Sequence, residues 1–354
     1  MLTSEQQSAL FQWKNLVAEA GLDRLLIHDA EKEGKGSPQI AERFQVLARL
    51  FGEAAVVDRS GVEACVPDEV LSTLEALGLV NRLGDKLEST YRLVFHLGLG
   101  LFCEKVSRSA KFYYGYDSIQ LSRMIAGAEG SVLDLCSGVG AQALVCARTA
   151  ARVTAVEIEP QAAKLFWVNA AMNGLSDKLE LIAGDLLEPV AGRRFDLIAC
   201  NPPFMPVPPG VRYPRFADGG TDGLDMVRRL MAGLPDALAP DGRCEVVGAV
   251  LGTSESPDLA PFKKMAADSG LALILECCTR EELGGATLKQ LVDTALDGSR
   301  REEIERAFQS HFASHNATHL YCFFLHAVRA PSPMVCTSYC DEAGSITYRM
   351  TPFP

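Results

Sequence analysis

Short apolar runs alternate with longer amphipathic segments between residues 130 and 330. Seven of these runs have the length and composition of buried strands: SVLDLC (131–136), RVTAVEIE (152–159), KLELIAGD (178–185), FDLIAC (195–200), RCEVVGAVL (243–251), LALILECC (271–278) and LYCFFLHAV (320–328). Three segments between them predict helices: 141–150, 160–174 and 223–238. Continuous apolar strands separated by helices predict a doubly wound, Rossmann-like α/β sheet that helices cover on both faces.

The first 110 residues follow a different pattern. SEQQSALFQWKNLVAEAG is an amphipathic helix, and helical segments continue through residues 40–52 and 67–80. A hairpin that turns at Gly84-Asp85 comes next. Helices followed by a hairpin predict a mainly helical, winged-helix-like cap domain over residues 1–110.

Charge argues against DNA binding by this module. Residues 1–125 contain 14 Lys and Arg against 17 Asp and Glu, whereas a duplex binder needs several cations on one face. The whole chain of 354 residues has a net charge of -11. A structural or substrate-covering role is therefore favoured over nucleic-acid binding.

The rest of the chain divides into a second domain over residues 111–330 and a C-terminal tail over residues 331–354. The mostly helical, charged segment 279–319 is an insertion in the second domain, and both a lid and a purely packing role are open for it.

The 11 cysteines are interpreted as thiols because the chain is long and their number is odd. The chain shows no secretory signal and no apolar run long enough for a bilayer, so we expect a cytoplasmic protein.

Three strand ends carry residues suited to a nucleotide. VLDLCSGVG (132–140) turns from a strand into a helix, and its glycines allow a ligand close to the backbone. Cys136 takes the place of the first glycine in the D-x-G-x-G-x-G series. Glu157, near the end of the next strand, can accept both hydroxyls of a ribose. Asp185, which ends the third strand, can accept from an adenine amino group.

The fourth strand ends on Asn201-Pro202-Pro203-Phe204. Two prolines fix the backbone and remove competing donors. The Asn201 side-chain carbonyl and the Pro202 main-chain carbonyl then form a pair of acceptors for an –NH2 group, and Phe204 offers an aromatic face to a planar group. Such acceptors favour a nitrogen lone pair aimed at an electrophile and stabilise the positive charge that develops on that nitrogen. A tight exit from a buried strand is the simpler alternative.

With these four elements, the chain resembles the class I S-adenosylmethionine-dependent methyltransferases. More narrowly, it is similar to the subgroup with Asn-Pro-Pro-aromatic after the fourth strand, which methylates nitrogens of glutamine amides, adenine or guanine. The likeness is strong over about residues 125–255.

The resemblance assigns roles to individual residues. It implies S-adenosylmethionine as the cofactor, with residues 111–330 as the binding and catalytic domain, and no metal. The acceptor would lie against Asn201, Pro202 and Phe204. The residues expected to contact the cofactor are Asp134, Cys136, Ser137, Gly138, Gly140, Glu157, Ile158, Asp185, Leu186 and Asn201.

Three further sets of residues are less informative about function than the four strand-end elements. Tyr113, Tyr114 and Tyr116 precede the first strand of the sheet. They either close over the cofactor, where an aromatic face suits a sulfonium, or pack the N-terminal module. Arg212 and Arg215 are more simply solvated loop charges than contacts to an acidic substrate. His311, His315 and His319 would share one face of a helix, and an ordinary helical face is favoured over zinc.

The function that fits best is N-methylation of an amide or amino group on a small molecule or a protein. One alternative is a cyclase or aminobutyrate transferase that consumes the same cofactor and releases methylthioadenosine, for example in forming azetidine-2-carboxylate. A second alternative is a winged-helix DNA-binding regulator. The sequence does not indicate the acceptor or the oligomeric state.

Overall fold

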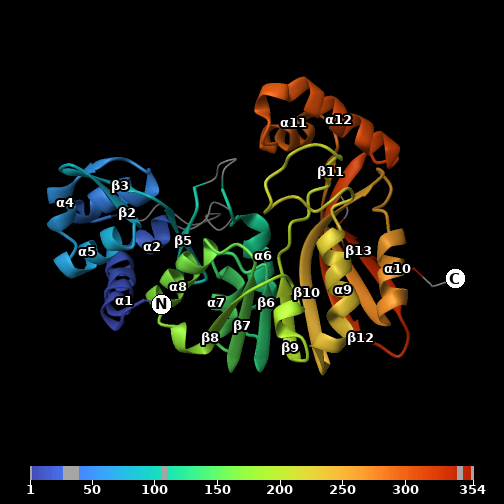
Figure 1. Cartoon of the computed structure of the whole chain (residues 1–354), viewed down its shortest axis with the longest axis horizontal. Coiled ribbons are helices and arrows are strands. Elements are labelled where there is room, and N and C mark those ends of the chain that lie inside the picture. The colour runs from blue at the N-terminus through green and yellow to red at the C-terminus, as the bar shows by residue number, and fades with distance from the viewer. Residues whose placement is uncertain (1, 27–39, 106–109, 341–345, 352–354) are drawn as a thin grey trace. The chain divides into compact units, whose positions relative to one another are not determined.

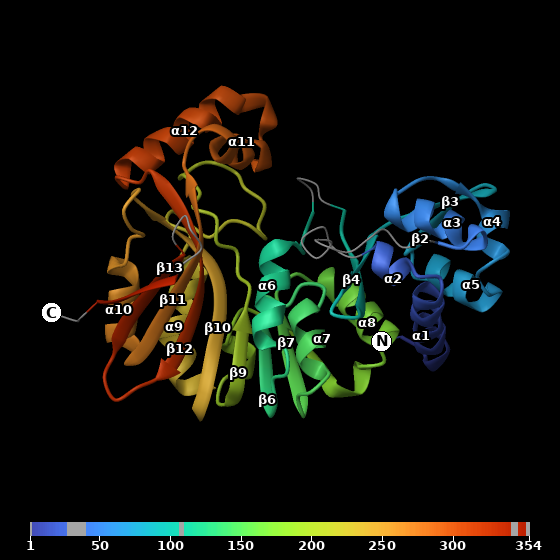
Figure 2. The same cartoon turned by 180° about the vertical axis from the view of Figure 1, so that it is seen from behind.

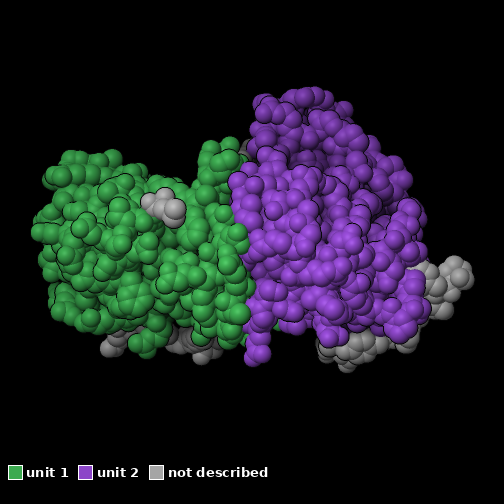
Figure 3. Space-filling model, turned by 60° about the horizontal axis from the view of Figure 1, so that its bottom comes forward, with its two compact units in different colours: residues 1–127, 138–153, 159–181 green, residues 128–137, 154–158, 182–354 purple. Residues whose placement is uncertain are grey.

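A computed structural model of the chain describes residues 2–26, 40–105, 110–340 and 346–351. The chain divides into two compact units, and Figure 3 colours each of them. Unit 1 contains residues 1–127, 138–153 and 159–181, and unit 2 contains residues 128–137, 154–158 and 182–354. Among the described residues, no helix has the length and apolar character needed to span a membrane.

Unit 1 begins with small helices and two small sheets. Thr3 caps the first helix, because its hydroxyl accepts from the Gln6 N–H while the Gln6 side chain accepts from the Thr3 N–H. The elements are α1 (Ser4–Glu19), α2 (Leu22–Leu25), α3 (Gln45–Leu47), a π-helical turn (Ala48–Gly52), β1 (Val57–Asp58), α4 (Arg59–Glu63), α5 (Asp68–Ala76), β2 (Val80–Leu83), β3 (Lys86–Ser89), β4 (Arg92–His96) and β5 (Leu99–Cys103).

The three short strands β1, β3 and β2 pair in that order, and the two helices α4 and α5 lie between β1 and β2 in the chain. The β2–β3 hairpin turns where Leu83 pairs with Lys86, as the Gly84-Asp85 signal predicts. This element order is the one that a winged-helix-like module requires, and the assignment to that class remains a prediction. The helix α5, with the sequence DEVLSTLEA, contains acidic residues and no basic one, so its charge opposes approach to a phosphate backbone.

The later part of unit 1 contains three further helices. They are α6 (Tyr116–Ile125), α7 (Ala141–Ala147) and α8 (Ala162–Met172). Within unit 1, α6 packs on α7, and α8 packs on both α1 and β5. The core of this region includes Trp13 on α1, Phe102 on β5 and Phe166 on α8, all with no exposed surface.

A nine-stranded sheet has the order β14-β13-β11-β12-β10-β9-β6-β7-β8, and Figure 1 and Figure 2 show its strands from opposite sides. Its strands are β6 (Ser131–Leu135), β7 (Arg152–Glu157), β8 (Leu179–Ala183), β9 (Phe195–Cys200), β10 (Leu238–Gly252), β11 (Leu271–Glu282), β12 (His319–Arg329), β13 (Met334–Cys340) and β14 (Ile346–Thr351). The strand β9 is parallel to both β6 and β10, whereas β12 is antiparallel to β10 and β11. The doubly wound α/β class is confirmed.

Two strands extend this sheet beyond the seven expected. The segment 331–354, expected to be a tail, contains β13, which is parallel to β11, and β14, which is antiparallel to β13. The expectation of a tail was therefore wrong for these residues. The stretch MVCTSYC was not predicted as a strand, and in the structure it pairs with β11.

Unit 2 also contains the helices α9 (Asp225–Ala237), α10 (Ala260–Ser269), α11 (Gly285–Thr294) and α12 (Arg301–Ser314). Figure 1 shows α9 and α10 in front of the strands β10 to β13. Their apolar side chains, among them Leu230 and Phe262, form one core with the strands. The helices α11 and α12 form a second core with β10 and with the loop that follows β9.

A charged cluster around one buried carboxylate extends over β10, β12 and β11. The carboxylate of Glu245, which is 4% exposed, lies opposite His326 in the strand register. Its Oε2 is 2.5 Å from His326 Nδ1, and its Oε1 is 3.1 Å from Arg243 Nε. Glu276 lies 3.6 Å from His326 Nε2. The hydrogen bond to Glu245 raises the pKa of His326 above its usual range, although burial acts in the opposite direction.

This cluster predicts a pH dependence of stability. Because the folded pKa of His326 is raised, its contribution is fully present below the ordinary histidine value of about 6.5 and is lost as pH rises through the folded pKa. We expect the unfolding free energy of His326→Gln to be lower by on the order of 1 kcal/mol below pH 6.5 and to vary less with pH. Urea titrations between pH 5 and pH 9 measure this.

The matched control is His315→Gln, because exposed His315 bonds a main-chain carbonyl, that of His311, instead of a carboxylate. That variant should keep the pH dependence of the parent. Equal curves for His326→Gln and the parent would contradict the role of the Glu245–His326 pair.

Candidate active site

Four neighbouring parallel strands end at one edge of the sheet, and unit 2 brings their terminal residues together. In the register of β6 and β9, Leu135 pairs with Cys200. Cys136 and Asn201 therefore leave their strands at the same level. The Ser137 N–H donates to the Val156 carbonyl over 3.2 Å, and the Gly184 N–H donates to the Glu157 carbonyl over 3.0 Å. These bonds tie the turns after β6 and β8 to the end of β7.

Asp134 lies inside the sheet at the start of the first turn. It is 1% exposed, and its Oδ2 accepts from the Ser137 hydroxyl over 2.6 Å. The observed contact of this carboxylate is thus with the turn that it precedes. Contact between Asp134 and the cofactor remains a prediction.

Two non-glycine residues at this edge have left-handed backbone conformations. Cys136, in the position of the first glycine of the series, has φ of 55°, and Leu186, directly after Asp185, has φ of 47°. Such residues cost on the order of 1 kcal/mol each and persist where the surroundings determine the conformation. The strand end therefore needs a glycine-like turn at position 136, and this chain makes that turn with cysteine.

Gly138 and Gly140 belong to unit 1 and open the helix α7. Both have positive φ, 52° and 87°. A Cβ on Gly140 would lie 2.7 Å from the Phe166 ring, so the turn needs glycine there for space as well as for conformation. At Gly138, the nearest atom to an added Cβ is the Phe112 Cβ at 3.8 Å. The Gly138 backbone is therefore open enough for a ligand to approach.

Glu157 is the last residue of β7 and Asp185 comes shortly after β8. Both are half-buried, whereas Ile158 is 41% exposed and Leu186 is buried. Arg229 on α9 donates to Asp185 Oδ2 over 2.8 Å. This hydrogen bond raises the pKa of the Arg229 guanidinium. Since a carboxylate offers two oxygens, Asp185 can still accept from an amino group. Arg229 was missed in the sequence, because nothing in a helical arginine indicates a partner 44 residues earlier.

Two half-buried carboxylates and a glycine turn are what an adenosyl cofactor requires. Ribose hydroxyls and an adenine amino group are donors, and Glu157 and Asp185 are acceptors at successive strand ends. The residues present therefore fit S-adenosylmethionine.

The segment that follows β9, residues 201–224, is named the acceptor loop here. It runs out and back as two limbs joined by main-chain hydrogen bonds. Met205 donates to the Ala217 carbonyl over 2.8 Å and accepts from the Gly219 N–H over 3.0 Å, and Val207 donates to the Gly220 carbonyl over 2.9 Å. Prolines occupy other positions of the first limb, where no donor is needed. Asn201 is half-buried and Pro202 is buried at the start of this limb.

Two glycines of the return limb touch the backbone of Phe204. A Cβ on Gly219 would lie 2.6 Å from the Phe204 Cα, and one on Gly223 would lie 2.5 Å from the Phe204 carbonyl oxygen. Gly223 also has φ of 81°. Neither glycine was named as a site residue from the sequence, although the glycine-rich segment 211–226 follows the Asn-Pro-Pro-Phe motif and its cluster GGTDG indicates a close approach.

The helices α11 and α12 pack against the acceptor loop. Their buried side chains, including Phe308 and Phe312, form one core with Val207 and Tyr213, and Phe204 packs against it. The Tyr213 hydroxyl donates to the Leu291 carbonyl over 3.2 Å. These contacts favour a packing role over a swinging lid for the segment 279–319.

Polar contacts also join the segment 279–319 to the acceptor loop. Arg212 pairs with Asp297 at 3.3 Å, which is a structural contact. His311 Nε2 lies 2.6 Å from the Thr221 carbonyl. The expectation of three histidines on one helical face was wrong, because α12 ends at Ser314 and His319 begins β12. The described residues contain no cluster that could hold a metal.

The three tyrosines of unit 1 do not share one environment. Tyr114 is 5% exposed, whereas Tyr113 and Tyr116 are 45% and 53% exposed. The Tyr113 hydroxyl lies over Gly115, where an added Cβ would be 1.7 Å away. Burial at the hydroxyl end raises the pKa of Tyr113 to about 12, although much of the ring surface is exposed. A shield of three tyrosines over a sulfonium remains a prediction.

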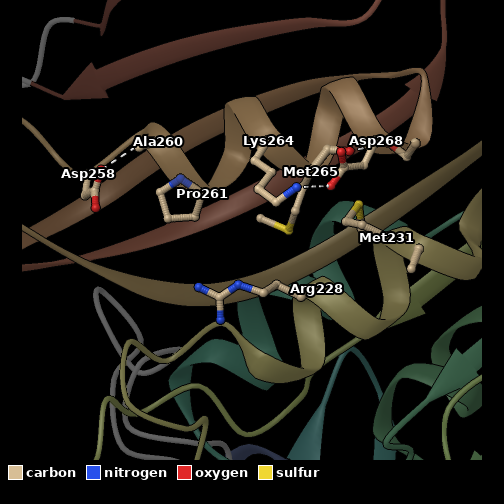
Figure 4. A pocket seen from close by; sticks show the side chains of 10 residues that line it. Arg228, Met231, Asp258, Ala260, Pro261, Lys264, Met265 and Asp268 are labelled. Atoms are coloured by element: carbon tan, nitrogen blue, oxygen red, sulfur yellow. Dashed lines mark hydrogen bonds and ion pairs between the residues drawn. The ribbon is translucent and has the colours of Figure 1, made fainter.

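A groove of 390 Å³ lies between α9 and α10 and contains none of the predicted site residues. Figure 4 shows Met231 and Met265 along it, with charged side chains at its sides. Lys264 pairs with Asp268 at 2.8 Å, and Arg228 pairs with Asp222 and Asp225. Its charged groups serve the helices themselves, so we assign no ligand to this groove.

Comparison with known proteins gives three kinds of match. Residues 118–253 match the model of the methyltransferase small domain. A putative protein N5-glutamine methyltransferase of Methanocaldococcus jannaschii is 32% identical over 155 residues, which are 42% of this chain and 77% of that protein. A solved tRNA m1G37 methyltransferase from M. jannaschii has a TM-score of 0.40 at 15% identity, and the match covers 69% of this chain and 60% of that one.

Bacterial relatives match over a shorter part of their length. The ribosomal protein uL3 glutamine methyltransferase of Bradyrhizobium diazoefficiens is 41% identical over 127 residues, covering 32% of this chain and 40% of that protein. The enzyme of the same name from Bordetella pertussis is 35% identical over 164 residues, covering 43% and 54%. This chain thus spans about half the length of these two relatives.

The family model and the relative from M. jannaschii confirm the class that the resemblance of the strand-end motifs implies. The matched region 118–253 contains the glycine turn, Glu157, Asp185 and the Asn-Pro-Pro-Phe motif. The chain belongs to the class I S-adenosylmethionine-dependent methyltransferases, in the family that contains the protein N5-glutamine methyltransferases.

Proposed function

We propose that this chain transfers a methyl group from S-adenosylmethionine to the side-chain amide nitrogen of a glutamine in a protein. The observation that carries the proposal is the position of Asn201. It leaves β9 at the level where Cys136 leaves β6. The next two strands of the sheet beyond β6 are β7 and β8, and the carboxylates suited to the cofactor, Glu157 and Asp185, lie at their ends. The names of the relatives, which methylate glutamine in a ribosomal protein or a release factor, support an amide of a protein over a free small molecule.

The cofactor supplies an electrophilic methyl group on a sulfonium, and the chain aligns an acceptor with it. An amide nitrogen is a poor nucleophile because its lone pair is delocalised. Asn201 Oδ1 and the Pro202 carbonyl would accept the two N–H bonds, which favours a pyramidal nitrogen with its lone pair free for attack. The aromatic face of Phe204 would lie against the planar amide group. Alignment to about 3–3.5 Å then provides most of the catalysis.

The acceptor loop has the rigidity that such alignment requires. Gly219 and Gly223 leave no space between the return limb and the Phe204 backbone, and the core around Phe308 holds the other side. A shift of about 1 Å in a positioning group can lower the rate by about 100-fold. The packing of α11 and α12 therefore bears on catalysis, although these helices lie outside the cofactor-binding motifs.

The first test is to identify the product and the labelled acceptor. We expect protein incubated with methyl-labelled S-adenosylmethionine and a cell extract to release S-adenosylhomocysteine and to label a protein band. Acid hydrolysis is avoided because it removes amide methyl groups; proteolysis and mass spectrometry should locate methylglutamine. Label in nucleic acid or in small molecules, or methylthioadenosine above spontaneous decay, would contradict the proposal.

The catalytic role of Asn201 has its own prediction. Asn201→Ala removes one of two acceptors for the reacting amide, so we expect kcat to fall by about 100-fold or more. Binding of S-adenosylhomocysteine, measured by calorimetry, should change far less, which separates a catalytic defect from misfolding. An Asn201→Ala variant with the activity of the parent would exclude the proposed acceptor site.

A pair of glycine variants tests the rigidity of the acceptor loop. Gly210 and Gly223 have nearly the same φ, 83° and 81°, so alanine costs about the same backbone strain at each, about 1 kcal/mol. Only Gly223→Ala also places a Cβ against the Phe204 carbonyl, because nothing lies within 4 Å at Gly210. We expect Gly223→Ala to lower kcat by about tenfold or more and Gly210→Ala to retain most of the activity. Equal rates for the two variants would show that the contact with Phe204 is unimportant.

A further inference from the structure

Two buried asparagines of α8 and its C-terminal end bond the main chain of β5, in unit 1. Asn169 is fully buried, and Asn173 is 8% exposed. The Asn169 Oδ1 accepts from the Phe102 N–H over 2.7 Å, and its Nδ2 donates to the Phe102 carbonyl over 3.0 Å. Asn173 makes the same pair of bonds with Gly100, at 3.1 Å and 2.7 Å. Each amide thus pairs with one main-chain N–H and one main-chain carbonyl of β5, as the backbone of a neighbouring strand would.

The third hydrogen bond of each asparagine is different. Asn173 Nδ2 donates to the Asn169 carbonyl within the helix, over 2.8 Å. Asn169 Nδ2 donates to the Val139 carbonyl, over 3.0 Å. Val139 lies between Gly138 and Gly140, the two glycines with left-handed conformations in the turn after β6. Of these two asparagines, Asn169 is the one that joins β5 to the glycine turn.

The same helix face touches the turn at a second point. The Phe166 ring, one helical turn before Asn169, covers Gly140 so closely that a Cβ there would lie 2.7 Å from it. The turn is thus held from α8 by one apolar contact and one hydrogen bond. Glycines have much conformational freedom, so these contacts determine the conformation that the turn presents to a ligand.

The β5 end of this connection is anchored in the N-terminal core. Phe102 has no exposed surface, and its ring contacts Phe51 with centroids 6.2 Å apart. Phe51 in turn contacts Trp13 on α1 at 5.2 Å. A continuous set of contacts within unit 1 therefore extends from α1 through Phe102 and Asn169 to Val139.

We propose that Asn169 is a positioning residue for S-adenosylmethionine: it fixes the glycine turn against β5, so that the N-terminal region of the chain takes part in cofactor binding. This inference rests on the proposed function in one respect, that the cofactor lies against the turn at residues 136–140. Asn169 itself is buried behind the turn and acts through Val139. The amide is suited to this role because one side chain provides both an acceptor and two donors.

The test compares Asn169→Ala with Asn173→Ala in the full-length chain. Each variant loses three buried hydrogen bonds, two of them to β5, so both should unfold at lower urea concentration. Calorimetric titration then measures the affinity of each variant for S-adenosylhomocysteine, and this affinity should distinguish the two variants. We expect the affinity of Asn169→Ala to fall by about tenfold, the effect of one lost buried bond, and that of Asn173→Ala to change by less than about twofold.

Hydrogen–deuterium exchange provides a second measurement that does not need a ligand. Amides of residues 136–145 should exchange faster in Asn169→Ala than in the parent and at the parent rate in Asn173→Ala. If Asn169→Ala does not fold, Asn169→Ser, which keeps a small hydroxyl, replaces it in both measurements. Equal affinity for all folded variants, or an equal loss in both positions, would overturn the positioning role. A parent protein that does not bind S-adenosylhomocysteine would instead contradict the cofactor site itself.

Discussion

Main-chain hydrogen bonds between the turns that follow neighbouring strands are the constraint on which the site depends. Ser137 bonds the end of β7, and Gly184 bonds it from the other side, so the residues after three strands cannot separate. Parallel pairing of β6 with β9 adds the fourth strand end at the same level. Carboxylates and an amide from four distant segments thereby reach one edge of the sheet, where an adenosyl ligand and an acceptor can meet.

Different contacts support the cofactor side and the acceptor side of the proposed site. On the cofactor side, polar contacts dominate: Asp134 accepts from Ser137, Asp185 from Arg229, and Asn169 holds the Val139 carbonyl. On the acceptor side, close packing dominates, because glycines allow the return limb to touch Phe204 and an apolar core holds the loop from α11 and α12. A cofactor needs partners for its polar groups, whereas a reacting amide needs a fixed position.

Most of the sequence-based description rests on patterns that local physics determines. The seven apolar runs from 131 to 328 are strands in the structure, and the motifs lie at the strand ends where they were expected. The hairpin at Gly84-Asp85 is also present. By contrast, β13 and β14 were not foreseen, since their residues adopt strands only through pairing at the edge of an existing sheet.

The sequence by itself determined the α/β class and indicated Glu157, Asp185 and Asn201 as candidate residues, because periodicity and residue types at strand ends are local properties of the chain. The cofactor was inferred from the resemblance of these motifs to the class I methyltransferases. Only the tertiary structure decided that Arg229 engages Asp185, that Gly223 touches Phe204, and that Asn169 bonds Val139. Each of these contacts joins residues between 19 and 44 positions apart, and no periodicity along the chain encodes which side chains packing brings together.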